Sequence, residues 1–191
     1  MKFHIYLFRH GQTTYNRDKR FTGWTNPPLT KLGIENATTV AKKLKGKKIQ
    51  VAVTSGLKRS KDTLIEVLKF HPECKVVIED RRMIERSYGS ISGKQHTSII
   101  KKYGQEQYDR WHRGYSVRPP DGESFKDVER RVKPFIKELV GVVKKDKVNV
   151  AISAHGNSIR LFRKIMEGAT EAETSSWVIP FDKVYTYTIE V

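Results

Sequence analysis

Residues 2–11 read Lys-Phe-His-Ile-Tyr-Leu-Phe-Arg-His-Gly and contain the strand that decides the fold. The run from Phe3 to Phe8 is short, apolar and rich in aromatic and β-branched residues, which predicts a strand buried on both faces. It leads directly into Arg9, His10 and Gly11. The sequence therefore predicts a histidine in the turn at the end of an interior strand.

A second segment repeats this arrangement further along the chain. Val148 to Ile152 is another apolar run, and residues 153–157 after it read Ser-Ala-His-Gly-Asn. Ligand sites in open α/β sheets lie outside the carboxyl ends of the strands. One histidine in such a turn is more typical of a structural residue, but two favour a common site for His10 and His155.

The rest of the chain alternates between strand-like and helix-like segments. Weaker strand signals lie at Ile49–Val53 and Lys75–Ile78, helical spacing of apolar residues covers Thr30–Leu44, Lys58–Phe70 and about Asn157–Met166, and Lys183–Val191 is typical of an edge strand. Strand followed by helix, repeated, predicts an α/β fold with a mainly parallel sheet and helices on both faces.

The longest predicted helix runs from about Ser124 to Val143. Ser124 and Asp127 have the spacing of an N-terminal capping pair, with aspartate in place of the usual glutamate. Pro134 lacks a backbone donor, so we expect it to kink or split the helix.

The segment from Asp80 to Gly122 differs in character, because it has glycine, serine, proline and aromatic residues but no long apolar stripe. It is interpreted as a lid, about residues 80–122, inserted in a single domain over residues 1–191.

Composition narrows the class of protein. The chain is 37% apolar, 30% charged and has no apolar run near the roughly 18 residues of a membrane span. Met1 leads straight into the first strand, without the pattern of a secretion signal. Cys74 is the only cysteine, which excludes an intrachain disulfide. We therefore expect no membrane partner and a reducing, cytoplasmic location.

The formal net charge of +16 favours encounters with anions. Many lysines cluster at residues 42–48 and 144–147, near predicted helix ends, where they are typical of a solvated face that complements the helix dipole. Nucleic-acid binding has some support from Trp111 and Tyr115, which lie near several arginines, but no recognised motif accompanies them. We expect a small phosphorylated substrate and no nucleic acid. The oligomeric state stays open.

The residues at the strand ends suit phosphoryl transfer. The neutral nitrogen of His10 is a nucleophile near neutral pH if the other ring nitrogen donates a hydrogen bond. The guanidinium groups of Arg9 and Arg59 have the geometry to hold phosphoryl oxygens. Glu85 in the lid is a candidate general acid and base. On sequence alone, Arg59 is equally typical of a surface helix, and a lone lid glutamate is more often solvated.

Several motifs together resemble the histidine phosphatase superfamily, in its cofactor-dependent phosphoglycerate mutase branch. They read Arg-His-Gly-Gln-Thr at 9–13 with Asn16, Phe-Thr-Gly-Trp at 21–24, Glu-Arg-Ser-Tyr-Gly at 85–89, Gly-Glu-Ser at 122–124, and Ala-His-Gly-Asn-Ser at 154–158. The match covers the chain from Phe3 to about Gly168.

The resemblance implies roles for individual residues. His10 would be phosphorylated, Arg9, Arg59 and His155 would surround the phosphoryl group, and Glu85 would donate and accept the proton. Positions that match phosphate-binding or glycerate-binding residues are Asn16, Thr22, Gly23, Tyr88, Arg113 and Asn157. It also implies 2,3-bisphosphoglycerate as the phosphoryl primer, and no metal.

Departures from the mutase pattern keep a second enzyme class open, a histidine phosphatase that hydrolyses small phosphomonoesters. Ser87 stands in place of the usual histidine, and His112 in place of one of two arginines. His96 stands where a lysine is usual, and either His96 or Lys94 would take over its role. The stretch between Pro119-Pro120 and residues 122–124 is shorter than in typical mutases, and the chain ends at Val191 without the tail of the branch. Less cover over the site admits water, which would hydrolyse the phosphohistidine.

Overall fold

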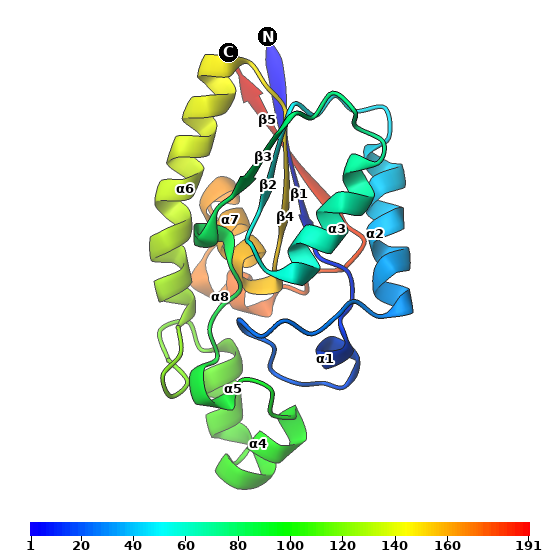
Figure 1. Ribbon diagram of the computed structural model, residues 1–191. Helices are drawn as coiled ribbons and strands as arrows, with labels where there is room; N and C mark the ends of the chain where they lie inside the picture. The colour runs from blue at the N-terminus through cyan, green and yellow to red at the C-terminus, as the bar shows by residue number, and fades with distance from the viewer.

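The computed structural model describes residues 1–191 and is built around a five-stranded sheet with the order β3-β2-β4-β1-β5 (Figure 1). The strands are β1 (Lys2–Arg9), β2 (Val51–Thr54), β3 (Val76–Glu79), β4 (Val150–Ala154) and β5 (Val184–Glu190). Four strands run parallel, and β5 pairs antiparallel with β1. The mainly parallel sheet and the edge strand at the C-terminal end of the chain are both confirmed.

Strand β1 lies inside the sheet, between β4 and β5. Its register with β4 pairs Ile5 with Val150 and Arg9 with Ala154. Because parallel strands end at the same edge, this register brings His10 and His155, the residues that follow the two strands, to one place. The interior strand predicted for residues 3–8 is therefore confirmed, together with its histidine at the end.

Helices cover both faces of the sheet, as predicted (Figure 1). The helices are α1 (Thr14–Arg17), α2 (Lys31–Leu44), α3 (Lys58–Leu68), α4 (His96–Tyr103), α5 (Gln105–Arg113), α6 (Phe125–Asp146), α7 (Gly156–Glu167) and α8 (Glu171–Ser176), with 3-10 turns η1 (Arg81–Met83) and η2 (Gly89–Ile91). Tyr6 and Phe8 of β1 pack in a core with α2 and α3. Ile5 and Leu7 point to the other face, into the larger core with α6 and α7.

Helix α6 begins at the predicted cap and continues beyond the predicted end. The Ser124 side chain accepts a hydrogen bond from the Asp127 backbone, and the Asp127 carboxylate accepts one from the Ser124 backbone. Of the two expected effects of Pro134, a kink or a split, the split is wrong, because the helix is continuous through this residue. Pro134 lies on the exposed face, where water satisfies the carbonyl that loses its intrahelical donor.

The segment from residue 80 to residue 122 lies beyond the carboxyl ends of the parallel strands, at the lower end of Figure 1. It contains two helices, α4 and α5, that its sequence did not predict. Phe21, Tyr88, Ile91 and Ile99 form a small core of their own there. The segment is thus held to the N-terminal loop by a cluster separate from the two main cores.

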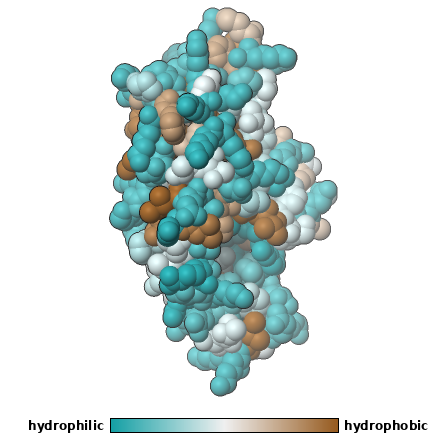
Figure 2. Space-filling view, turned by 90° about the vertical axis from the view of Figure 1, so that its right-hand side faces the viewer, coloured by the Kyte–Doolittle hydropathy of each residue, from teal (hydrophilic) through white to brown (hydrophobic).

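The surface is mainly hydrophilic, and in Figure 2 the hydrophobic residues form separate groups on it. The exposed apolar residues include Leu32 and Ile34 on α2, Ile65 on α3, and three successive residues of the edge strand β3, Val76–Ile78. No helix combines the length and the apolar character needed to span a bilayer.

Candidate active site

His10 lies in the turn after β1 with only 2% of its surface exposed. Its Nδ1 donates to the carbonyl oxygen of Gly11 at 2.7 Å, which leaves the lone pair on Nε2. The turn is tightly packed, because a Cβ on Gly11 would lie 2.0 Å from the carbonyl oxygen of Gly33 in α2. Burial, followed by the charges of Arg59 and Arg9, holds the pKa of His10 well below its usual range. The imidazole is therefore neutral and oriented for nucleophilic attack through Nε2.

Arg59 projects from the first turn of α3 onto the His10 ring and is fully buried. Its Nε donates to Nε2 of His10 at 3.2 Å, while its two terminal nitrogens donate to the carbonyl oxygens of Thr25 (2.7 Å) and Gly23 (2.8 Å). Burial lowers the pKa of Arg59 to about 10, so it remains a cation at neutral pH. The guanidinium is thus held in one orientation beside Nε2 of His10.

His155 lies on the other side of His10, with 5.0 Å between the two ring centroids. Its Nε2 is hydrogen-bonded to the Ser55 hydroxyl at 2.6 Å, and its Nδ1 is buried without a partner in the protein. The Ser55 oxygen also accepts from the backbone of Leu57. Ser55 therefore links the His155 ring to the turn before α3 and fixes the orientation of the ring. Burial and the charge of Arg59 hold the pKa of His155 well below its usual range.

Arg9 directly precedes His10, and its side chain is anchored by two contacts. One terminal nitrogen donates to the Ile179 carbonyl oxygen at 2.7 Å, and the guanidinium carbon lies 4.0 Å from the centre of the Phe181 ring. Its Nε is buried and has no partner in the protein. Burial lowers the pKa of Arg9. A desolvated cation with a free donor is suited to an anionic ligand group.

Glu85 follows η1 and comes close to the start of α7. One of its carboxylate oxygens accepts from the backbone nitrogens of Arg86 (2.8 Å) and Asn157 (3.1 Å). The side chain of Asn157 continues this network, because its amide nitrogen donates to the Tyr88 hydroxyl and its amide oxygen accepts from Arg160. The carboxylate is therefore placed by two different segments of the chain, as a proton-transfer group requires.

A cavity of about 190 Å³ lies in this region. Seven of the eleven predicted site residues line it, namely Arg9, Asn16, Thr22, Glu85, Tyr88, Arg113 and Asn157. The other four do not line it: Gly23 accepts from Arg59, and His10, Arg59 and His155 form the buried group described above.

A family model described as histidine phosphatase superfamily (branch 1) matches residues 5–190. The chain belongs to this superfamily. A 2,3-bisphosphoglycerate-dependent phosphoglycerate mutase of Chelativorans sp. (strain BNC1) is 40% identical over 175 residues, which are 88% of this chain and 84% of the relative.

Solved structures of the superfamily confirm the α/β fold. A protein described as mycobacterial hydrolase 1 superposes with a TM-score of 0.86 at 25% identity, over 98% of this chain and 92% of that chain. A mycobacterial glucosyl-3-phosphoglycerate phosphatase superposes with a TM-score of 0.79 at 28% identity, over 91% and 86% of the two chains. The chain is thus similar both to mutases and to phosphatases of the superfamily.

The segment from residue 80 to residue 122, which the sequence predicts to be a lid, lines part of the cavity, and we call this part the distal wall. His96 and His112 stand there at positions where the resemblance predicts cations. The His96 ring is stacked on Phe21 with centroids 4.2 Å apart, and its Nδ1 is hydrogen-bonded to the Tyr108 hydroxyl at 2.7 Å. Burial lowers the pKa of His96, and burial followed by the charge of Arg113 lowers the pKa of His112 to about 3. Both imidazoles are therefore neutral at physiological pH. Lys94 does not line the cavity.

Sequence reasoning missed two further arginines of the cavity, Arg20 and Arg160. Arg160 follows Asn157 by three residues on α7, so both occupy the same helix face. That spacing is the one signal that the sequence contains. Burial lowers the pKa of Arg160 to about 9. No cluster of three or more histidine, cysteine or carboxylate side chains suited to a metal ion is present.

Proposed function

We propose that this superfamily member is a phosphoglycerate mutase that interconverts 3-phosphoglycerate and 2-phosphoglycerate through a phosphohistidine on His10. The observation that carries the proposal is the charge of the cavity, whose lining includes four arginines, Arg9, Arg20, Arg113 and Arg160, but a single carboxylate, Glu85. None of the four forms an ion pair with a protein carboxylate. A phosphate at one end and a carboxylate at the other would complement this charge.

The same excess of guanidinium groups fits 2,3-bisphosphoglycerate, which supplies the priming phosphoryl group when it is bound. Within the chain, Arg9, Arg59 and His155 surround the phosphoryl group and donate to its oxygens. His10 attacks through Nε2, because its Nδ1 hydrogen is committed to Gly11. These groups stabilise the charge that spreads over the phosphoryl oxygens in the transition state.

Proton transfer is assigned to Glu85. As the bond between His10 and phosphorus forms and the bond from phosphorus to the substrate oxygen breaks, Glu85 gives a proton to that oxygen. It then accepts the proton of the hydroxyl that attacks the phosphohistidine. Asn16, Thr22, Gly23, Tyr88, Arg113 and Asn157 bind the phosphate or glycerate portions in this proposal.

Hydrolysis of small phosphomonoesters is the second candidate function. The specific observation in its favour is the distal wall, where neutral His96 and His112 take positions at which the mutase branch has cations. A substrate held less firmly there leaves the site more easily, and water then reaches the phosphohistidine. The similarity to a glucosyl-3-phosphoglycerate phosphatase supports the same candidate.

The test is incubation with 2,3-bisphosphoglycerate and 3-phosphoglycerate while 2-phosphoglycerate and free phosphate are followed together. We expect rapid formation of 2-phosphoglycerate with little phosphate. Release of phosphate alone, without isomerisation, would overturn the mutase in favour of the phosphatase.

A further inference from the structure

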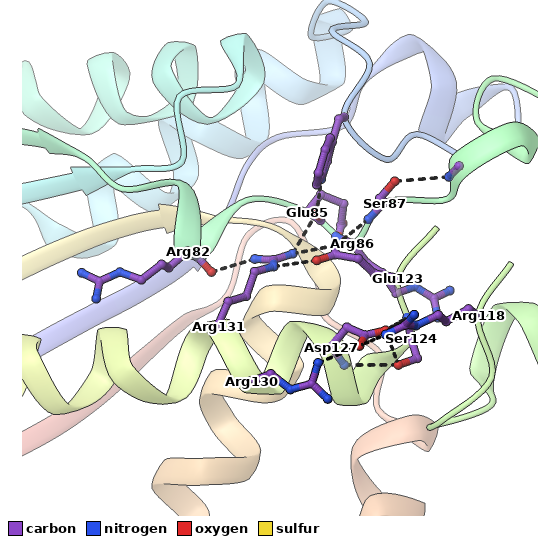
Figure 3. Close-up of polar contacts among 12 residues, drawn as sticks. Arg82, Glu85, Arg86, Ser87, Arg118, Glu123, Ser124, Asp127, Arg130 and Arg131 are labelled. Carbon is purple, nitrogen blue, oxygen red and sulfur yellow. Dashed lines mark hydrogen bonds and ion pairs between the residues drawn. The ribbon is translucent and has the colours of Figure 1, made fainter. Parts of the chain in front are cut away.

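The side chain of Arg131 connects α6 to the segment that carries Glu85 (Figure 3). One terminal nitrogen donates to the Arg82 carbonyl oxygen at 2.7 Å, and the other donates to the Glu85 carbonyl oxygen at 3.1 Å. The guanidinium also binds both carboxylate oxygens of Glu123, with Nε to oxygen at 3.0 Å and a terminal nitrogen to oxygen at 3.1 Å. Every nitrogen of the side chain is therefore in use.

Glu123 extends this contact to the other side of Glu85. Its carboxylate accepts from the backbone nitrogen of Ser87 at 2.9 Å, and its own backbone nitrogen donates to the Ser87 carbonyl oxygen at 2.9 Å. The Arg131 and Glu123 side chains are only 19% and 20% exposed. A bidentate pair with little exposure to water is stronger and more directional than a surface ion pair.

The pair therefore holds the backbone on both sides of Glu85 and at Glu85 itself. Residues 84–88 belong to no helix or strand, since η1 ends at Met83 and η2 begins at Gly89. The Glu85 carbonyl oxygen also accepts from the indole nitrogen of Trp24 at 2.7 Å. On the cavity side, the Glu85 carboxylate contacts the start of α7 through Asn157. The direction of the carboxylate thus depends on where α6 holds its backbone.

We propose that Arg131, together with Glu123, is a positioning residue that sets the Glu85 carboxylate for proton transfer. Neither side chain lines the substrate cavity. The inference rests on the proposed role of Glu85 as the acid that protonates the leaving oxygen. A displacement of about 1 Å in a reacting group lowers rates by up to about a hundredfold, so loss of the clamp acts on the proton-transfer step without removing a contact to substrate.

Leaving-group dependence separates positioning from general damage. An alkoxide needs a proton as its bond to phosphorus breaks, whereas p-nitrophenolate leaves as a stable anion. We therefore compare kcat/KM for p-nitrophenyl phosphate with kcat/KM for the alkyl ester 3-phosphoglycerate. For Arg131→Gln we expect about a thirtyfold loss with the alkyl ester and less than about a threefold loss with the aryl ester.

Two further variants guard against failure of Arg131→Gln to fold. Arg131→Lys retains the charge but not the fork, and Glu123→Gln retains an acceptor for Ser87 but not the ion pair. Both should show the same selective loss to a smaller extent, with thermal unfolding midpoints near that of the parent protein. Arg130→Gln is the matched control, because it makes the same change on the neighbouring, exposed residue, and we expect both rates to be unchanged.

Glu85→Gln distinguishes failure of this inference from failure of the proposed function. If Glu85→Gln loses the alkyl ester selectively while the Arg131 and Glu123 variants lose both esters equally or neither, the positioning role is overturned and the acid role stands. If Glu85→Gln itself shows no selectivity, Glu85 is not the acid, and the positioning role is overturned with it.

Discussion

Histidine side chains lie in two regions of the site and make different contacts there. We call these regions the sheet end, with His10 and His155, and the lid end, with His96 and His112. At the sheet end, Nδ1 of His10 is committed to Gly11, and Nε2 is the nitrogen that we propose for attack. At the lid end, His96 is stacked on Phe21 and bonded to Tyr108. Burial lowers the pKa at both ends, so every one of these rings is neutral. The contacts of each ring, and not its protonation state, therefore distinguish the proposed nucleophile from a packing residue.

The two ends also differ in the helices and strands on which they are built. The sheet end is built on the termini of β1 and β4 and on the first turn of α3, with His155 and Arg59 fully buried. The lid end depends on two short helices and a core of four buried residues, Phe21, Tyr88, Ile91 and Ile99. In the proposed function, the chemistry belongs to the end that is built on the sheet, and we expect substrate choice to depend on the other end.

The largest expected effect comes from removing the nucleophile. We expect His10→Ala to lower turnover by at least about ten-thousandfold, since the proposed bond to phosphorus forms at Nε2 of this residue. The measurement is transfer of labelled phosphate from 2,3-bisphosphoglycerate to the protein, as an acid-labile adduct. His96→Ala at the lid end is the control and should still be labelled. Labelling of His10→Ala would contradict the proposal that the phosphoryl group is bound by His10 at the sheet end.

The sheet end was largely predictable from the sequence, for physical reasons. An interior parallel strand is a continuous apolar run, so its end can be located, and parallel strands bring their ends together. That reasoning identified His10 and His155. The capping pair at Ser124 and Asp127 was equally local and was confirmed.

The lid end was not predictable in the same way. Helix α4 buries only Ile99 and α5 buries no residue fully, so neither shows an apolar stripe in sequence. Arg131 and Arg160 lie on helices, where arginine is typical of a solvated face, and their partners come from distant segments. At the sheet end, Ser55 was not predicted either, because its bond to His155 spans 100 positions.

A smaller effect should appear in the pH dependence of stability. The pKa of His112 is about 3 in the folded protein and near 6.5 when unfolded, so below pH 6.5 the unfolded state binds more protons. Stability from this group is complete above pH 6.5 and is lost as pH falls. The loss reaches about 2 kcal/mol at pH 5. His112→Phe retains a ring and should remove that part of the pH dependence.

Chemical unfolding of parent and variant at pH 7 and pH 5 measures the difference. His4→Phe is the control, because His4 lies on β1 outside the lid cluster. An unchanged pH dependence in His112→Phe would mean that burial at the lid end does not keep this imidazole neutral. The statement that the histidines at both ends are neutral would then be wrong.

The smallest expected effect concerns the fate of the phosphoryl group. His96→Lys with His112→Arg returns two cations to the distal wall, beside Arg113. About 1.4 kcal/mol of charge-assisted hydrogen bonding to the glycerate end would raise its residence roughly tenfold. The ratio of 2-phosphoglycerate to free phosphate should rise by that factor, while the rate of His10 labelling stays the same. His4→Lys adds a charge outside the cavity and should leave the ratio unchanged. A constant ratio in the double variant would mean that access of water to the phosphohistidine is controlled around His10 and not at the distal wall.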